Sequence, residues 1–323
     1  MRLSRSVALP LAAALLAPLG GCGKSKPDAE AANIISPAGA PALDLTANPT
    51  LLFQVFGERD DPRLVPVAAV VNGAIRPIGL TASGWRALDS IYFATGAKYP
   101  IYHDDAVFGE LAVTHDRPNT RLPGCKAQKP IAAAVLTFQE AHPDQTVEFV
   151  ASSTPLAPHA PFTGKLPTAA EIAKLGREIG HEVGKKSAMD NAELDSLDFH
   201  ARMIVTGAAS EPTLLVSFID PNGGDLGPGK GHTSHLFMLA DKAGATYEAT
   251  YRHAVSGDAR TVEFQRVVDH LDVNNDGIDE IILESWKYGA DPELVVLNFK
   301  AGLWHEALRI KQSWCLDPPK DRK

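Results

Sequence analysis

Short apolar or β-branched runs, each ended by turn residues, are the feature that most limits the folds open to this chain. The sequence contains 24 prolines and 26 glycines, which interrupt helices and mark turns. The first group of expected strands covers residues 51–56, 65–71, 74–80, 107–114, 131–138 and 146–151. The second group covers residues 202–206, 213–219, 235–240, 246–252, 262–268, 279–283 and 294–299. This pattern predicts a mainly β (α+β) fold.

Short connections indicate that neighbouring strands pair antiparallel. Asn72 and Gly73, between two expected strands, are typical of a two-residue hairpin, because both central positions of the favoured turn need positive φ. Residues 241–244 and 300–302 are similar links. Successive strands joined in this way form meanders, so we expect the C-terminal portion to be propeller-blade-like or a sandwich.

One amphipathic helix is expected between the two β portions, within residues 165–195. Thr168 and Glu171 match a capping box, in which each side chain satisfies a backbone donor of the other residue. The apolar positions that share one face are Ile172, Leu175, Ile179 and Val183. Gly176 and Gly180 weaken the helix by up to about 1 kcal/mol each. A shorter helix is expected to begin at Ser83, its N-cap.

The N-terminus has the pattern of an export signal. Arg2 and Arg5 precede an apolar run, residues 7–19, that is too short to span a bilayer and indicates a signal peptide. The following Leu19-Gly20-Gly21-Cys22 resembles the lipobox of bacterial lipoproteins. That resemblance implies that residues 1–21 are removed and that Cys22 carries lipid. A plain secretory signal with an incidental cysteine is the alternative.

The same resemblance implies a location. In lipoproteins an Asp after the lipidated cysteine marks inner-membrane retention, and this chain has Gly23. We therefore expect a protein of the cell envelope, lipid-anchored in the outer membrane and facing the periplasm or the surface. Residues 22–50 resemble a flexible tether because they are rich in Ala, Pro, Ser and charge. The expected domains are then residues 51–164, β-rich, the linker helix at 165–195, and a C-terminal β domain at 196–323.

Two further cysteines, Cys125 and Cys315, remain after lipidation. An even pair in an oxidising compartment predicts one disulfide, which would tie the first half of the chain to its last residues. Two unpaired thiols are the alternative.

The charge of the chain excludes one class of partner. The formal charge is -8, and removal of Arg2 and Arg5 with a leader that holds no acid lowers it to -10. Nucleic-acid binding depends on Lys and Arg that neutralise phosphates, so we expect no nucleic-acid partner. The membrane, through Cys22, is the expected partner, and a protein or glycan partner stays unidentified.

The segment from Asp272 to Glu280 is the one with residue types and spacing suited to specific chemistry. Oxygen-bearing side chains alternate at Asp272, Asn274 and Asp276, Gly277 permits a sharp turn, and Glu280 closes the segment before an apolar run. Carboxylate and amide oxygens at such spacing are how a chain surrounds a hard cation. An acidic β-turn, in which Asp and Asn bond their own backbone, is the alternative.

This segment resembles the calcium loops of FG-GAP and VCBS-type repeats, whose pattern is D-x-[DN]-x-D-G-x-x-[DE]. The resemblance implies one structural Ca²⁺. Its expected ligands are the side chains of Asp272, Asn274, Asp276 and Glu280 and the carbonyl of Ile278. The loop does not match an EF-hand, because position twelve is Leu283 and a strand is expected to follow.

These features favour an envelope protein that acts as a binding or structural module over an enzyme. The alternative is an envelope hydrolase with the cation near its cleft. Trp286, Trp304 and Trp314 are interpreted as packing residues, with a carbohydrate-stacking surface as the alternative.

Overall fold

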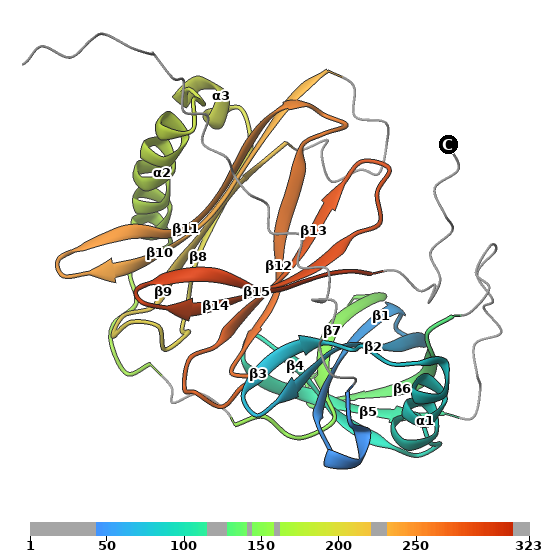
Figure 1. Ribbon diagram of the computed structural model, residues 1–323. Helices are drawn as coiled ribbons and strands as arrows, with labels where there is room; N and C mark the ends of the chain where they lie inside the picture. The colour runs from blue at the N-terminus through green and yellow to red at the C-terminus, as the bar shows by residue number, and fades with distance from the viewer. Residues whose placement is uncertain (1–42, 115–127, 141–143, 158–161, 221–230, 313–323) are drawn as a thin grey trace, which may run out of the picture. The chain divides into compact units, whose positions relative to one another are not determined.

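Antiparallel sheets make up most of the computed structural model, which describes residues 43–114, 128–140, 144–157, 162–220 and 231–312 (Figure 1). The mainly β (α+β) fold expected from the short apolar runs is confirmed. All the described residues belong to one compact unit. The predicted boundary after residue 164 falls between the last strand of the first sheet and the long helix.

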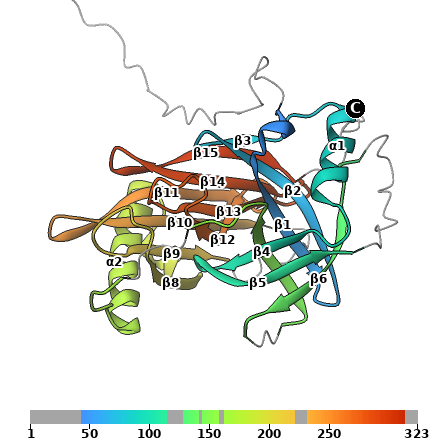
Figure 2. The same cartoon turned by 90° about the horizontal axis from the view of Figure 1, so that it is seen from below.

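The N-terminal sheet closes on itself. Its strands are β1 (Thr50–Glu58), β2 (Asp61–Val71), β3 (Ala74–Pro77), β4 (Lys98–His103), β5 (Ala106–Val113), β6 (Ala132–Phe138) and β7 (Thr146–Ser152). The order β1-β7-β4-β5-β6-β2-β3, with β1 also paired to β2, joins six strands in a ring and leaves β3 beside β2 (Figure 2). The Asn72-Gly73 hairpin between β2 and β3 is confirmed, with φ of 52° and 73°.

The helix α1 (Ala82–Tyr92) and the 3-10 turn η1 (Leu45–Ala47) contribute to the core of this closed sheet. Phe53 lies at its centre, with ring centroids 5.0 Å from Tyr99 and 5.8 Å from Phe93. The expected N-cap at Ser83 is wrong by two positions: the hydroxyl of Thr81 accepts the N–H of Gly84. Strand β4 was not expected, because Pro100 interrupts its apolar pattern.

The C-terminal portion consists of two four-stranded meanders. The first meander comprises β8 (Asp198–Ile204), β9 (Thr213–Ile219), β10 (His232–Ala243) and β11 (Thr246–Asp258). The second comprises β12 (Glu263–Leu271), β13 (Glu280–Lys287), β14 (Glu293–Lys300) and β15 (Leu303–Lys311). In both, strands pair in chain order, as in a propeller blade. The two meanders pack face to face, as sandwich layers do, through a shared cluster that includes Leu215, Phe237, Leu283 and Val295.

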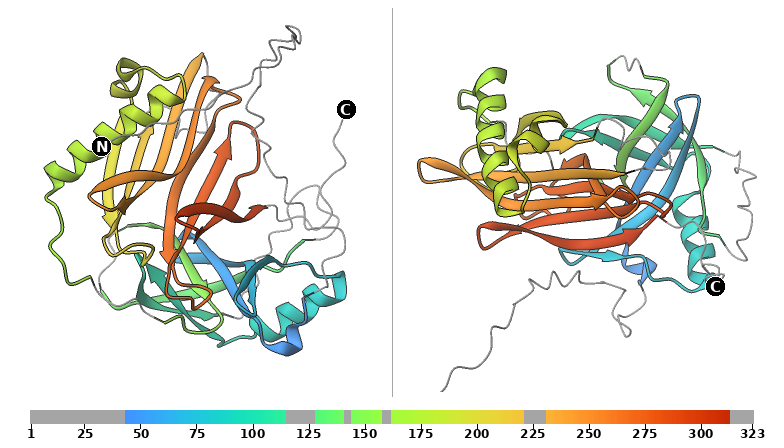
Figure 3. Two further views of the ribbon diagram at one scale, coloured as in Figure 1. Left: turned by 60° about the vertical axis from the view of Figure 1, so that its left-hand side comes forward. Right: turned by 90° about the horizontal axis from the view of Figure 1, so that it is seen from above.

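The helix α2 (Ala169–Lys186) covers the outer face of the first meander, and the short α3 (Asn191–Asp195) follows it (Figure 3). The predicted capping box is present, since Thr168 and Glu171 exchange side-chain and backbone hydrogen bonds. A Cβ built on Gly180 would lie 2.4 Å from the Phe218 ring, and one on Gly176 would lie 3.1 Å from Val216. The glycines therefore let the helix backbone approach the sheet closely.

The outer face of the second meander packs on the closed sheet. Ile282 and Val296 share a buried cluster with Leu52 and Tyr102. Because Ile281 and Leu283 face the first meander, the β12–β13 hairpin is buried on both faces. The hairpin is thus firmly held in the fold, and it positions the candidate site.

The N-terminal and cysteine predictions lie outside the described residues. These are the lipid on Cys22 and the disulfide between Cys125 and Cys315, both of which stay predictions. In the part of the chain that the structure describes, no helix has both the length and the apolar character needed to cross a bilayer.

Candidate metal-binding loop and meander cleft

The loop at residues 272–279 joins β12 to β13 and is organised by its first residue. The Asp272 carboxylate accepts the N–H groups of Asp276 at 3.1 Å and Gly277 at 2.9 Å. The backbone turns through positive φ at Asn275, 61°, and Gly277, 86°. Asp272 is buried, whereas Asp276 is exposed. The sharp turn at Gly277 therefore occurs where the sequence pattern predicts it.

Asn274 lies between two carboxylates. Its Nδ2 donates to Asp276 Oδ2 at 3.0 Å and to Glu280 Oε1 at 2.5 Å. The second Glu280 oxygen accepts the N–H of Val273 at 3.1 Å. Burial, followed by the negative charge of Asp276, raises the pKa of the Glu280 carboxyl to about 8. Asn274 thus contacts two of the other predicted ligand side chains, those of Asp276 and Glu280.

The donor set suits a hard cation. Oxygens of carboxylates, an amide and a backbone carbonyl are the ligands that Ca²⁺ prefers, and the Asn274 amide supplies only weak positive charge between Asp276 and Glu280. Ile278 is half-buried, and its N–H donates to Asp276 Oδ1 at 2.9 Å. Among the described residues, no three His, Cys, Asp or Glu side chains are grouped as metal ligands.

Asp279 turns away from the loop. It is fully buried, its Oδ2 lies 2.7 Å from His270 Nδ1, and its N–H donates to the carbonyl of Thr206 at 2.8 Å. These contacts attach the end of the loop to the first meander. His270 was not identified from the sequence, because it lies on β12, before the loop, and its partner Asp279 lies at the far end of the loop.

A cavity of about 890 Å³ borders the loop. The loop contributes Val273, Asn274 and Asn275 to its lining, and the β2–β3 hairpin contributes Asn72 and Gly73. The hairpin and the loop approach closely, since a Cβ on Gly73 would lie 3.9 Å from the Asn274 carbonyl oxygen.

A second and larger cavity, of about 1050 Å³, lies between the two meanders, and we call it the meander cleft. Its lining comes from β8, β9, β10, β12, β13 and the turn after β13. The polar and aromatic lining residues are His200, Arg202, Ser217, Phe237, Gln265, Arg266, Glu284, Trp286, Lys287 and Tyr288, and the aliphatic ones include Leu215 and Val267. The cleft is at the end of the β12–β13 hairpin remote from the loop, because Glu263 pairs with Lys287 there and Leu271 pairs with Glu280 at the loop.

The positive side chains of the meander cleft are all ion-paired. The pairs are Arg202 with Asp104, Arg266 with Glu148 and Glu284, and Lys287 with Glu263. The nitrogen–oxygen distances are between 2.5 and 3.0 Å. The basic groups of the cleft are thus neutralised by the protein itself.

Gln265 is a fully buried residue in the lining of the meander cleft. Its Oε1 accepts the hydroxyl of Tyr251 at 3.1 Å, whereas its Nε2 has no hydrogen-bond partner among the described residues. Its backbone N–H donates to His235 Nε2 at 3.0 Å, and His235 Nδ1 lies 3.0 Å from the carbonyl of Phe218. His235 therefore links β12 to β9, and burial lowers its pKa to about 3.

Of the tryptophans singled out in the sequence, one packs in the core and another lines the meander cleft. Trp304 is buried and its Nε1–H donates to Asp241 at 2.8 Å, which confirms a packing role. Trp286 is half-buried and stacks on Phe264, with centroids 5.6 Å apart and planes at 23°. Trp314 lies outside the described residues.

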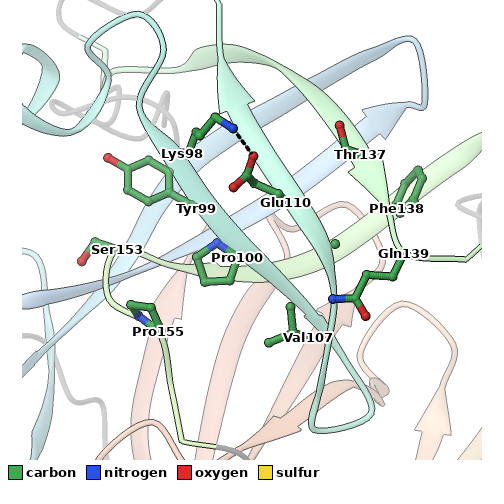
Figure 4. A pocket seen from close by; sticks show the side chains of 11 residues that line it. Lys98, Tyr99, Pro100, Val107, Glu110, Thr137, Phe138, Gln139, Ser153 and Pro155 are labelled. Carbon is green, nitrogen blue, oxygen red and sulfur yellow. Dashed lines mark hydrogen bonds and ion pairs between the residues drawn. The ribbon is translucent and has the colours of Figure 1, made fainter.

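A third hollow, of about 490 Å³, lies on the closed sheet (Figure 4). Lys98 and Glu110 form an ion pair of 2.6 Å across it, beside Tyr99 and Pro100. At its floor a Cβ on Gly109 would lie 2.3 Å from the Thr137 carbonyl oxygen, so the glycine permits β5 and β6 to approach.

Comparison of this chain with protein-family models, with curated protein sequences and with solved structures gives no match. Its function is therefore argued from the loop and the meander cleft.

Proposed function

We propose that this protein is a binding module of the bacterial cell envelope, anchored by lipid on Cys22 and stabilised by one Ca²⁺ in the loop at residues 272–280. The lipid holds the protein at the outer membrane, where it faces the periplasm or the cell surface. The observation that carries the calcium proposal is the contact of Asn274 with the Asp276 and Glu280 carboxylates, where burial and like charge raise the pKa of Glu280.

The proposed ligands are the side chains of Asp272, Asn274, Asp276 and Glu280 and the carbonyl of Ile278. A divalent cation favours the ionised form of each acid and offsets the repulsion among them. The role of the ion is structural, because the hairpin that it would brace is buried on both faces.

The hydrolase alternative has one observation in its favour, the cavity of about 890 Å³ beside the loop. A catalytic cation would need to face that cavity. The loop lines it with Val273, Asn274 and Asn275, whereas the Asp276 and Glu280 carboxylates are directed toward the Asn274 amide. This arrangement favours a bracing ion.

Thermal unfolding of the Cys22→Ser protein, with EGTA and with millimolar Ca²⁺, tests the proposal. Calcium at about 100 times its Kd stabilises the folded state by about 2.7 kcal/mol. For a chain of this size that raises Tm by roughly 4 °C. Asp276→Asn is expected to remove most of the rise, whereas Asp291→Asn, in the turn after β13, retains it. Equal Tm values with and without Ca²⁺ would contradict the proposal.

A further inference from the structure

We propose that the meander cleft binds an uncharged oligosaccharide segment. This inference goes beyond the calcium-braced module, because it assigns a ligand class to a second site. It does not rest on the calcium site, which is at the other end of the β12–β13 hairpin.

The size of the cleft suits a ligand larger than one sugar ring. Its volume of about 1050 Å³ slightly exceeds the range of about 300 to 1,000 Å³ that is usual for small-molecule sites. Its lining comes from both meanders, so a ligand would contact two sheets at once.

Aromatic rings are placed for stacking. Trp286 lines the cleft, and Phe264 covers one face of its ring and sets its orientation. Tyr288, in the adjacent turn, is 38% exposed. Trp and Tyr combine an apolar ring with a polar tip, which matches the alternating C–H and hydroxyl groups of a sugar.

The charge pattern selects a neutral ligand. Arg202, Arg266 and Lys287 are each paired with a carboxylate, so an anionic ligand would have to compete with a protein partner. A guanidinium–carboxylate pair nevertheless offers both donors and acceptors to a hydroxyl group. The neutral hydroxyls of a sugar can therefore bind without breaking the pairs.

Gln265 supplies an unused donor. A buried donor without an acceptor costs about 1 to 3 kcal/mol, and the Nε2 of Gln265 is such a group. Its Oε1 is held by Tyr251, which fixes the amide. Because Nε2 is covered as well as unpartnered, a ligand oxygen would reach it only after the neighbouring side chains move, and the new hydrogen bond would then relieve this cost.

Isothermal titration calorimetry of the full chain in detergent tests the inference. The neutral probes are the tetramers of β-1,4-linked N-acetylglucosamine, β-1,4-linked glucose and α-1,4-linked glucose, and the anionic probe is tetragalacturonate. We expect at least one neutral probe to bind at millimolar concentration and more tightly than the anionic probe. Trp286→Ala is expected to raise its Kd about tenfold, which corresponds to about 1.4 kcal/mol.

His200→Ala and His305→Ala form a matched pair. Both histidines are exposed on strands, but His200 lines the cleft and His305, on β15, does not. We expect the first variant to weaken binding and the second to leave it unchanged. Tyr288→Ala, in an exposed turn, replaces Trp286→Ala if that variant fails to fold.

Three outcomes overturn the inference: binding of no neutral probe, tighter binding of the anion, or equal affinity in the cleft variants and in His305→Ala. The titrations are repeated in EGTA and with Asp276→Asn. A parent protein that binds the sugar but whose Tm does not respond to Ca²⁺ refutes only the calcium site. A parent whose Tm responds to Ca²⁺ but that binds no sugar refutes only the cleft.

Discussion

Single residues couple the sheets of this protein, and His235 is the clearest case. It accepts a hydrogen bond from the backbone of β12 through Nε2, so it must stay neutral there. Burial, first, and neighbouring His253, second, lower its pKa to about 3. The sequence places His235 only at the start of an expected strand, residues 235–240. The acceptor role could not be predicted, because the donor belongs to Gln265, thirty residues further along.

A pH dependence follows from His235. Between about pH 6.5 and 3 the unfolded chain binds a proton at this residue that the folded protein does not, so the contribution of His235 to stability is lost as pH falls below about 6.5. The slope is about 1.4 kcal/mol per pH unit, and the loss at pH 5 is about 2 kcal/mol. Denaturant unfolding between pH 8 and 5 measures it as the difference between the parent and a variant without His235, because the raised pKa of Glu280 gives the parent a slope of opposite sign over this range.

The matched variants for this prediction are His235→Gln and His305→Gln. Glutamine does not titrate, so the first variant is expected to be less stable at pH 8 but to lose about 2 kcal/mol less than the parent between pH 8 and 5. The second changes an exposed histidine and should keep the slope of the parent. An unchanged slope in His235→Gln would contradict the assignment.

At the scale of elements, local signals were predicted well and contacts between elements were not. The capping box at Thr168 and the Asn72-Gly73 turn each depend on a few adjacent residues, and both are present. Gly176 and Gly180 were interpreted as weak points of the helix, whereas they allow α2 to approach β9. The loop at residues 272–280 was located from its spacing, but the meander cleft joins five strands and has no local pattern.

Replacement of Gly180 by alanine tests the packing of α2. Helix propensity favours alanine by up to about 1 kcal/mol. Overpacking against Phe218, 2.4 Å from the new Cβ, costs about 1 to 3 kcal/mol, so we expect a net loss of stability. Gly79→Ala is the control, because nothing lies within 4 Å of its Cβ position. Equal effects of the two changes in chemical denaturation would contradict this interpretation.

At the scale of the whole molecule, the mainly β class was predicted because apolar runs and turn residues alternate along most of the chain. The closure of the first sheet was not predicted, since the pairing of β1 with both β2 and β7 has no signature in either strand. The expected link between Cys125 and Cys315 belongs to this scale, because it would connect residues of the first half to the C-terminus.

Removal of that link is expected to lower the stability of the whole protein. In the chain-entropy model a disulfide closing so long a loop contributes roughly 4 to 5 kcal/mol. The Cys125→Ser/Cys315→Ser protein should therefore unfold at lower denaturant than the oxidised parent, and the reduced parent should match it. A parent whose transition is unaffected by reductant would show that the two thiols are unpaired.

The closed sheet also has a consequence for the order in which the protein folds. β1 meets β2 across a tight turn, but its other edge pairs with β7, where Phe53 lies opposite Ala151. Each meander, by contrast, is assembled from strands that follow one another along the chain. Because contacts between remote segments form more slowly than local ones, closure of the ring is the slow step. During synthesis the chain leaves the ribosome N-terminus first. Its first strand is therefore available early, but its first sheet can be completed only after β7 has left the ribosome.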